Sequence, residues 1–239
     1  MDIKNKVVLI TGANRGIGKA LVEEVAKQGA KKIYAAARDI AKLSLPDDPR
    51  FVKLQLDIVD AKSIQSVVMK VKDVEILFNN AGIATKSDIL NDDMESIRRD
   101  METNYFGTLQ LTRAMMPLLL DKSTAAIVNI LSVLSLASIS NLAGYCASKA
   151  ALFSATQALR SNLRSSNVKV FSVYPGPIDT DMTKNYDIPK PSAEITAEIM
   201  VHEIMNGKED IFPDPMSQDA AKIWLKDPKA LEKQFAEMQ

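Results

Sequence analysis

A tyrosine and a lysine four residues apart, Tyr145 and Lys149, are the side chains whose types and spacing best suit proton transfer. On a helix, positions i and i+4 share a face, so the phenol and the ammonium would address the same space. A phenol with a pKa near ~10 is a poor base at neutral pH, but a neighbouring ammonium favours its ionised form. Lowering that pKa by about two to three units corresponds to ~3–4 kcal/mol. Such pairs are also common on helix surfaces, so this one needs further support.

The composition removes the more familiar acid–base and metal sites. The chain has one histidine, His202, and one cysteine, Cys146, so it has neither an intrachain disulfide nor a zinc site of Cys and His ligands, and we expect no metal. A Ser-His-Asp hydrolase would depend on His202 alone. We interpret His202 as a surface or packing residue. Cys146 we interpret as a small buried residue that points away from Tyr145.

Charge and hydropathy exclude two further classes of protein. The balance of 30 Lys and Arg against 30 Asp and Glu argues against a nucleic-acid binder with a basic face. Residues 125–148 carry no charge, but Asn and Ser interrupt them too often for a membrane-spanning helix, and the first apolar run is too short for a signal peptide. We therefore expect a cytoplasmic protein that binds no membrane.

Short apolar runs alternate with stretches of helical period, which predicts a doubly wound parallel α/β sheet with helices on both faces. The predicted strands are Val7–Ile10, Ile33–Ala36, Val52–Gln55, Ile76–Phe78, Ile127–Leu131, Val170–Val173 and, weakly, Asp210–Phe212. The predicted helices are Lys19–Gln28, a helix capped by Asp60 and running to Lys70, Asn91–Leu120 bent or ended by Pro117, Ala147–Ser165, Ala193–Asn206, and an amphipathic tail Ser217–Gln239 broken near Pro228.

A glycine-rich turn, with Gly12, Gly16 and Gly18, follows the first strand and opens a helix. Without Cβ atoms in the way, backbone N–H groups and the helix N-terminus can face an anion such as a pyrophosphate. The spacing departs from G-x-G-x-x-G, and Ala20 after Lys19 leaves no Ser or Thr for the magnesium of a mononucleotide P-loop. A tight turn that binds nothing is the alternative.

The end of the second strand is where a dinucleotide site distinguishes the ribose 2′-hydroxyl from a 2′-phosphate. Arg38 offers a planar fork suited to phosphate, and Arg15 in the glycine turn is a second candidate. Asp39 complicates the interpretation, because it would suit a free ribose or simply cap the next turn. We expect NADP (NADPH) to be preferred, with NAD possible.

Taken together, the motifs resemble the short-chain dehydrogenase/reductase family. In the family's order, the glycine turn is followed by Asn79-Asn80-Ala81-Gly82, Asn104, Ser132, Tyr145 to Lys149, and Pro175-Gly176. Ser132 precedes Tyr145 by 13 residues, as in that family. The resemblance covers residues 6–180, and residues 181–239 carry no matching motif. It implies a single Rossmann-like domain of about seven strands over residues 1–239.

The resemblance implies catalytic roles for Ser132, Tyr145, Lys149 and Asn104. Tyr145 would donate its proton to a carbonyl oxygen during reduction and take it back during alcohol oxidation, when the oxidised nicotinamide's charge favours the phenolate. Ser132 would hydrogen-bond the same oxygen, with Ser135 a less well spaced competitor. Lys149 would also bind the nicotinamide ribose, and Asn104 would support a chain of water molecules that returns protons to bulk solvent.

The resemblance also implies contacts to the dinucleotide along the whole cleft. Asp57 would lie near the adenine and Thr180 near the carboxamide, although Asp57 could instead cap a helix, and Asn79-Asn80 could simply shape a turn. The full set expected to bind the cofactor is Gly12, Asn14, Arg15, Gly16, Ile17, Gly18, Arg38, Asp57, Asn79, Ala81, Gly82, Tyr145, Lys149, Pro175, Ile178 and Thr180.

The leading interpretation is an NAD(P)-dependent oxidoreductase that reversibly reduces a small-molecule ketone or aldehyde to an alcohol. A non-catalytic dinucleotide-binding redox sensor and a Rossmann-fold methyltransferase are the alternatives. The short polar segment 181–191 predicts a fairly open pocket, for which Leu134, Leu136, Ile139 and Met182 could form an apolar wall. The resemblance implies a homodimer or homotetramer formed through helices 91–120 and 147–165.

Overall fold

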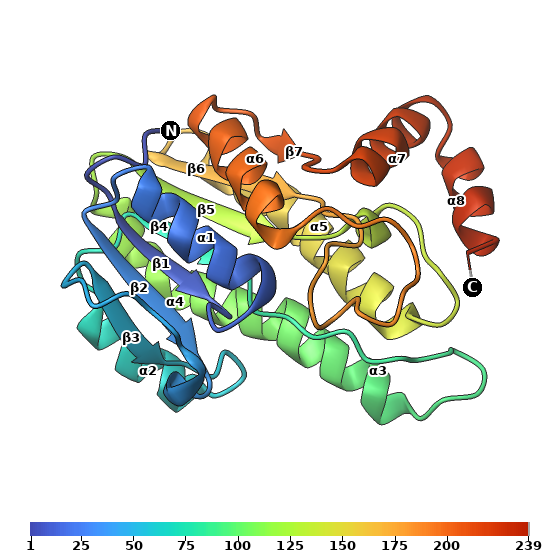
Figure 1. Ribbon diagram of the computed structural model, residues 1–239, viewed down its shortest axis with the longest axis horizontal. Helices are drawn as coiled ribbons and strands as arrows, with labels where there is room; N and C mark the ends of the chain where they lie inside the picture. Colours follow the sequence, from blue (N-terminus) through green and yellow to red (C-terminus); the bar gives the residue numbers. More distant parts are fainter. Residues whose placement is uncertain (239) are drawn as a thin grey trace.

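Seven parallel strands form one sheet in the order β3-β2-β1-β4-β5-β6-β7 (Figure 1). The computed structural model describes residues 1–238. The strands are β1 (Val7–Thr11), β2 (Lys32–Ala37), β3 (Phe51–Gln55), β4 (Ile76–Asn79), β5 (Ala125–Ile130), β6 (Val168–Val173) and β7 (Asp210–Ile211), so each predicted strand is confirmed to within two residues at either end. The strand order reverses between β1 and β4, which is where open α/β sheets bind nucleotides beyond their carboxyl ends.

Helices cover both faces of the sheet, as predicted (Figure 1). They are α1 (Gly16–Lys27), α2 (Ala61–Lys70), α3 (Met94–Asp100), α4 (Thr108–Leu120), α5 (Ala143–Leu163), α6 (Ala193–Met205), α7 (Pro215–Lys226) and α8 (Pro228–Ala236). Helices α1 and α6 pack on one face, and α2, α4 and α5 pack on the other. Within residues 1–238, no helix combines the length and the apolar character needed to cross a bilayer.

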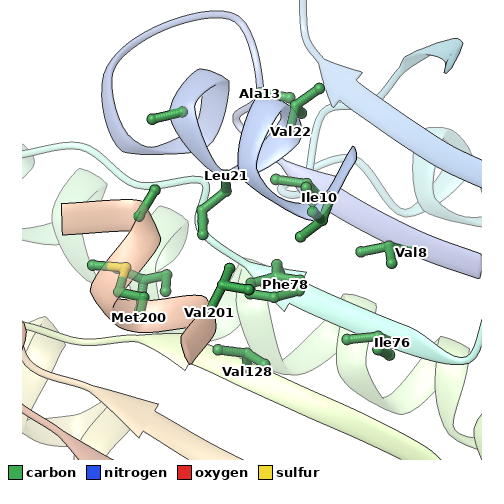
Figure 2. Packing of buried hydrophobic residues seen from close by; sticks show 14 of the residues in the cluster. Val8, Ile10, Ala13, Leu21, Val22, Ile76, Phe78, Val128, Met200 and Val201 are labelled. Atoms are coloured by element: carbon green, nitrogen blue, oxygen red, sulfur yellow. The ribbon is translucent and has the colours of Figure 1, made fainter. Parts of the chain in front are cut away.

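Alternation along the strands divides the apolar core into two layers. Ile10 and Phe78 face α1 and α6, where they meet Leu21 and Met200 (Figure 2). Leu9, the neighbour of Ile10 in sequence, faces the opposite layer with α2 and α4. Because successive side chains of a strand point to opposite faces, a strand buried on both faces needs a continuous apolar run. Each such side chain contributes roughly 1.5–3 kcal/mol by leaving water.

Polar side chains cap the starts of several helices, and the predicted cap at Asp60 is confirmed. Asp60 caps α2 by accepting from the Lys62 N–H at 2.9 Å. The predicted break in the tail is confirmed, because Asp227 caps α8 and Pro228 occupies its first position. The tail is thus two helices, and its last residue, Gln239, lies outside the described part of the chain.

The helical region predicted over residues 91–120 is confirmed from Met94 to Leu120, but its middle is irregular. Asp93 caps α3, a π-helical turn spans Met101–Gly107, and only then does α4 begin. Pro117 does not end α4, which continues to Leu120, because burial of α4 side chains such as Leu119 outweighs the loss of one backbone hydrogen bond. A π turn inside a helix often marks a functional position, and this one contains Asn104.

Helix α5 begins four residues before the predicted start at Ala147. Its first N–H groups find partners far away in the sequence: the Ala143 N–H donates to the Ser87 carbonyl at 2.9 Å, and the Gly144 N–H donates to Ser87 Oγ at 3.0 Å. This long-range cap places Tyr145 in the first turn of α5, close to the end of the sheet. No local sequence signal identifies such a cap.

Candidate active site

One cleft of about 1280 Å³ runs along the carboxyl ends of the strands. The loops after β1, β2, β3, β4, β5 and β6 all contribute to its walls. The predicted site residues that line it are Gly12, Asn14, Arg15, Gly16, Ile17, Gly18, Arg38, Asp57, Ala81, Gly82, Ser132, Tyr145, Lys149, Pro175, Ile178 and Thr180. The structure does not bring Asn79 and Asn104 to this surface.

The glycine turn is a close-packed backbone cradle. Gly12 has φ +64°, and a Cβ there would lie 2.9 Å from the Ala81 Cα. A Cβ on Gly18 would lie 2.1 Å from the Gly12 carbonyl oxygen, which forbids any side chain. Asn80 fixes the turn, since its Nδ2 donates to the carbonyls of Thr11 at 2.9 Å and Gly12 at 3.2 Å. The cradle, with the N-terminus of α1 facing the cleft, fits the pyrophosphate of a dinucleotide.

Arg38 and Asp39 have different roles at the end of β2. Asp39 accepts from the Ala41 N–H at 3.0 Å and caps the following 3-10 turn, the second of its two possible roles. Arg38 is exposed on the cleft, and within residues 1–238 its guanidinium forms no ion pair. A free planar cation at this position fits a 2′-phosphate better than a bare ribose.

Arg15 has a different neighbour. Its Nη1 donates to Asp181 Oδ2 at 3.2 Å, joining the glycine turn to the segment after β6. Both side chains are more than half exposed, at 61% and 64%, so the pair contributes little to stability. The carboxylate nevertheless competes with any phosphate for the Arg15 guanidinium.

The Lys149 side chain is buried and is held in place by a hydrogen bond to the sheet. It is 4% exposed, and its Nζ donates to the Ile130 carbonyl oxygen at 2.7 Å, at the end of β5. The same Nζ lies 5.7 Å from the centre of the Tyr145 ring, so the predicted i, i+4 face is confirmed. Burial lowers the pKa of Lys149 to about 8, and the charge of Asp100 opposes that shift. The ammonium keeps N–H donors for the cleft.

The expected lowering of the Tyr145 pKa by its surroundings is wrong for the protein's own groups. Desolvation raises the pKa of Tyr145 to about 12, and a hydrogen bond with Ser132 opposes the shift only in part. Lys149 does not outweigh this effect, because it is itself desolvated and its Nζ is directed to the Ile130 carbonyl. The phenol therefore holds its proton firmly at neutral pH, which suits a proton donor.

The hydrogen bonds of the two candidate serines, Ser132 and Ser135, distinguish their roles. Ser132 lines the cleft, and its Oγ accepts from the Leu134 N–H at 3.1 Å and approaches the Pro175 carbonyl at 3.4 Å. Ser135 Oγ donates to the Ser132 carbonyl and closes the turn without lining the cleft. Of these two serines, Ser132 is the one that lines the cleft together with Tyr145.

The Asn79 side chain does not contact the nucleotide as predicted, and the Asn104 side chain is buried behind the cleft. Asn79 is 4% exposed, and its Nδ2 donates into the interior, to Thr112 Oγ1 at 2.9 Å and Asn129 Oδ1 at 2.8 Å. Asn104 is fully buried, accepts from the Ile83 N–H at 2.9 Å, and donates to Ser148 Oγ at 2.9 Å. Asn104 thereby ties the loop after β4 to α5.

The alternative role of Asn80, shaping a turn, is confirmed, because its amide fixes the glycine turn. One supporting residue, Asp100, is not indicated by the sequence. Asp100 is fully buried, and it accepts from the Thr85 N–H at 3.0 Å and from Thr85 Oγ1 at 2.7 Å. Burial raises the pKa of Asp100, and no periodicity marks this carboxyl as buried because its partner comes from a loop.

The two residues excluded as catalysts lie where predicted. Cys146 is 1% exposed and packs in the interior beside the loop that precedes α5, where burial raises the pKa of its thiol. His202 is exposed on α6, with its Nδ1 3.6 Å from Glu203 Oε1. Neither side chain lines the cleft.

Comparisons of this chain with known proteins agree on one family. Residues 6–190 match the family described as short chain dehydrogenase. A dehydrogenase/reductase SDR family protein 7-like from Anopheles gambiae is 31% identical over 94% of this chain and 79% of its own length. The 3-oxoacyl-[acyl-carrier-protein] reductase FabG of Escherichia coli K12 is 34% identical over 77% of this chain and 78% of its own length.

A solved structure extends the similarity to nearly the whole chain. The short chain dehydrogenase from Burkholderia cenocepacia J2315, solved in complex with NADP, is 35% identical, has a TM-score of 0.93, and matches over 98% of this chain and 99% of that one. The chain therefore belongs to the short-chain dehydrogenase/reductase family and is an NAD(P)-dependent oxidoreductase.

The buried ammonium of Lys149 predicts a pH dependence of stability. Its pKa falls from 10.5 to about 8 on folding, so between these values the unfolded chain binds the proton and the folded chain does not. The contribution of this group to stability therefore rises with pH in that window. Between pH 8 and 10, the free energy of unfolding of the wild type should rise by about 2 kcal/mol more than that of Lys149→Met, measured by urea unfolding. Lys62→Met, an exposed lysine of α2, serves as the control and should keep the wild-type rise; equal slopes for wild type and Lys149→Met would contradict the assignment.

Proposed function

We propose that this enzyme reversibly reduces a ketone or aldehyde to an alcohol, prefers NADPH to NADH, and uses Tyr145 as the general acid and base. The observation that carries the proposal is the convergence of Ser132, Tyr145 and Lys149 in the cleft that also contains the glycine cradle. NADPH, when bound, supplies the hydride that adds to the carbonyl carbon. The protein's own side chains transfer the proton and hold the substrate and the cofactor.

Tyr145 handles the proton. In the reductive direction its Oη releases a proton to the carbonyl oxygen as negative charge builds there, and in the oxidative direction it takes the proton back. Its raised pKa keeps the acid form present at neutral pH. Ser132 Oγ, whose bond to the Pro175 carbonyl is long at 3.4 Å, can turn to donate to the same carbonyl oxygen.

Lys149 supports the reaction in two ways. Its ammonium, fixed on the Ile130 carbonyl, has remaining N–H donors for the nicotinamide ribose and places positive charge beside the phenol. Asn104, fully buried, acts through the loop after β4, and a chain of water molecules leading from it to bulk solvent remains part of the proposal.

The preference for NADPH rests on Arg38. Its guanidinium faces the cleft without an ion-pair partner within residues 1–238, whereas the neighbouring Asp39 is engaged in capping a turn. The Burkholderia structure solved with NADP supports the same choice. NADH remains the second cofactor, since Arg38 adds a contact to the 2′-phosphate without blocking a ribose.

We also propose that the enzyme acts in the cytoplasm as a homodimer or homotetramer. Helices α4 and α5 support this, because Leu109 and Met116 of α4 and Leu159 and Leu163 of α5 line a shallow surface groove between the two helices. A second copy that presents the same face would cover these side chains.

Tyr145→Phe tests the acid–base role. Removing the hydroxyl while keeping the ring should lower kcat by at least about 100-fold, because general acid catalysis typically contributes that much. The dissociation constant for NADPH, measured by nucleotide fluorescence, should stay within about two-fold. Tyr34→Phe, whose hydroxyl bonds to Asp73 outside the cleft, is the matched control and should retain wild-type turnover. Near-normal kcat in the Tyr145→Phe enzyme would refute the role.

Arg38→Leu tests the cofactor preference. Loss of a charge-assisted contact to phosphate is worth about 1.5–3 kcal/mol, so the KM for NADPH should rise about 10- to 100-fold. The KM for NADH should change less than about three-fold, because NADH lacks the group that Arg38 would bind. Arg164→Leu, an exposed arginine outside the cleft, controls for net charge. Equal rises for the two cofactors would overturn the preference.

A further inference from the structure

The two C-terminal helices, α7 and α8, lie beyond the carboxyl end of the sheet (Figure 1). Met216 of α7, Phe235 of α8 and Met238 just after it line the same cleft as Ser132 and Tyr145. The matched family region ends at residue 190, so these helices belong to the part of the chain that the family motifs do not describe.

These helices pack on the loop that follows the catalytic serine. Leu231 and Phe235, exposed by 0% and 2%, form an apolar cluster with Val133. Leu134 and Ile139 of the same loop pack against that cluster and also line the cleft. The helices therefore hold the outer wall of the cleft at the end where the substrate must lie.

A buried carboxylate anchors this unit to the catalytic loops. Asp214 is 2% exposed, accepts from the Gly176 N–H at 2.8 Å, and caps α7 by accepting from the Ser217 N–H at 2.9 Å. The adjacent Pro175 carbonyl accepts from the Val133 N–H at 3.1 Å. Met216 is thus placed relative to Ser132 through a short, rigid chain of hydrogen bonds.

The opposite wall is also apolar. Met182 and Ile188, from the segment after β6, are 46% and 41% exposed and line the cleft. Of the predicted apolar wall, Leu134, Ile139 and Met182 lie on the cleft, whereas Leu136 does not. Methionine side chains adapt to ligands of different shape, so this end of the cleft suits flexible apolar groups.

Charge at this end disfavours an anionic substrate tail. Among the described residues, Asp187 and Glu237 line the cleft with two lysines, Lys86 and Lys149, the second of which is held on the Ile130 carbonyl beside Tyr145. The other cations on the cleft, Arg15, Arg38 and Lys42, lie in the loops after β1 and β2. A carboxylate or phosphate at the far end of a substrate would find no cluster of cations to hold it.

We propose that α7 and α8 bind the apolar chain of the substrate through Met216 and Met238, which selects ketones that carry an uncharged chain of several carbons. The inference rests on the proposed reduction of carbonyl compounds and names the class of carbonyl compound. Residues of the C-terminal unit would then set substrate length, while Ser132 and Tyr145 set the chemistry.

Methyl ketones of increasing length, from 2-butanone to 2-undecanone, test the proposal with the full-length enzyme. With NADPH, kcat/KM of the wild type should rise about two- to four-fold per added methylene until the wall is filled, as expected for burial of CH₂ groups. In Met216→Ala and Met238→Ala this gradient should flatten for the longer ketones. Leu225→Ala, a 77% exposed residue of α7 outside the cleft, is the matched control and should keep the gradient.

Binding of the same ketones to the enzyme with NADP⁺, measured by calorimetry, separates the two proposals. A length-dependent affinity that the two methionine variants lose supports the apolar wall even where no ketone is turned over, and in that case only the proposed reaction fails. The proposed apolar wall is refuted if kcat/KM and affinity of the wild type do not depend on chain length. It is also refuted if both methionine variants keep the wild-type dependence of kcat/KM on chain length and unfold at the wild-type temperature.

Discussion

The site depends on one buried hydrogen bond, from the Lys149 ammonium to the Ile130 carbonyl at the end of β5. It joins α5 to the sheet at the point where the strands meet the cleft. Burying an ammonium is unfavourable, which is why the pKa of Lys149 falls to about 8, and only a partner as close as 2.7 Å makes the position tolerable. Because Tyr145 lies one helical turn before Lys149, the same bond also fixes the phenol.

A layer of buried polar groups behind the cleft holds the first turn of α5 in place. Ser87 caps α5 from a distant loop, Asn104 joins Ile83 to Ser148, and Asp100 fixes Thr85. Ser87, Asn104 and Asp100 are fully buried, so their bonds are made in a medium where an unpaired polar group is costly. The π turn that contains Asn104 is the backbone irregularity that lets this side chain reach the loop after β4.

The sheet and the reactive trio could be predicted because their signals are local. Apolar runs such as Val7–Ile10 mark strands buried on both faces, and the spacing of Tyr145 and Lys149 defines a shared helix face. What could not be predicted depends on contacts between distant residues: the start of α5 at Ala143 with its cap from Ser87, the π-helical turn around Asn104, and the inward orientation of Asn79. The raised pKa of Tyr145 belongs to the same group, since desolvation is set by the whole fold.

The fold holds Tyr145 as a protonated acid, and the positive charge of bound NADP⁺ would lower its pKa and favour the phenolate that alcohol oxidation requires. The most direct measurement is an NMR titration of ¹³C-labelled tyrosine, with the Tyr145 signal assigned from the Tyr145→Phe variant, in the protein alone and with NADP⁺. We expect a pKa of about 12 in the protein alone and a value lower by at least about two units with NADP⁺. A Tyr145 that titrates near pH ~10 in both samples, like an ordinary tyrosine, would contradict it.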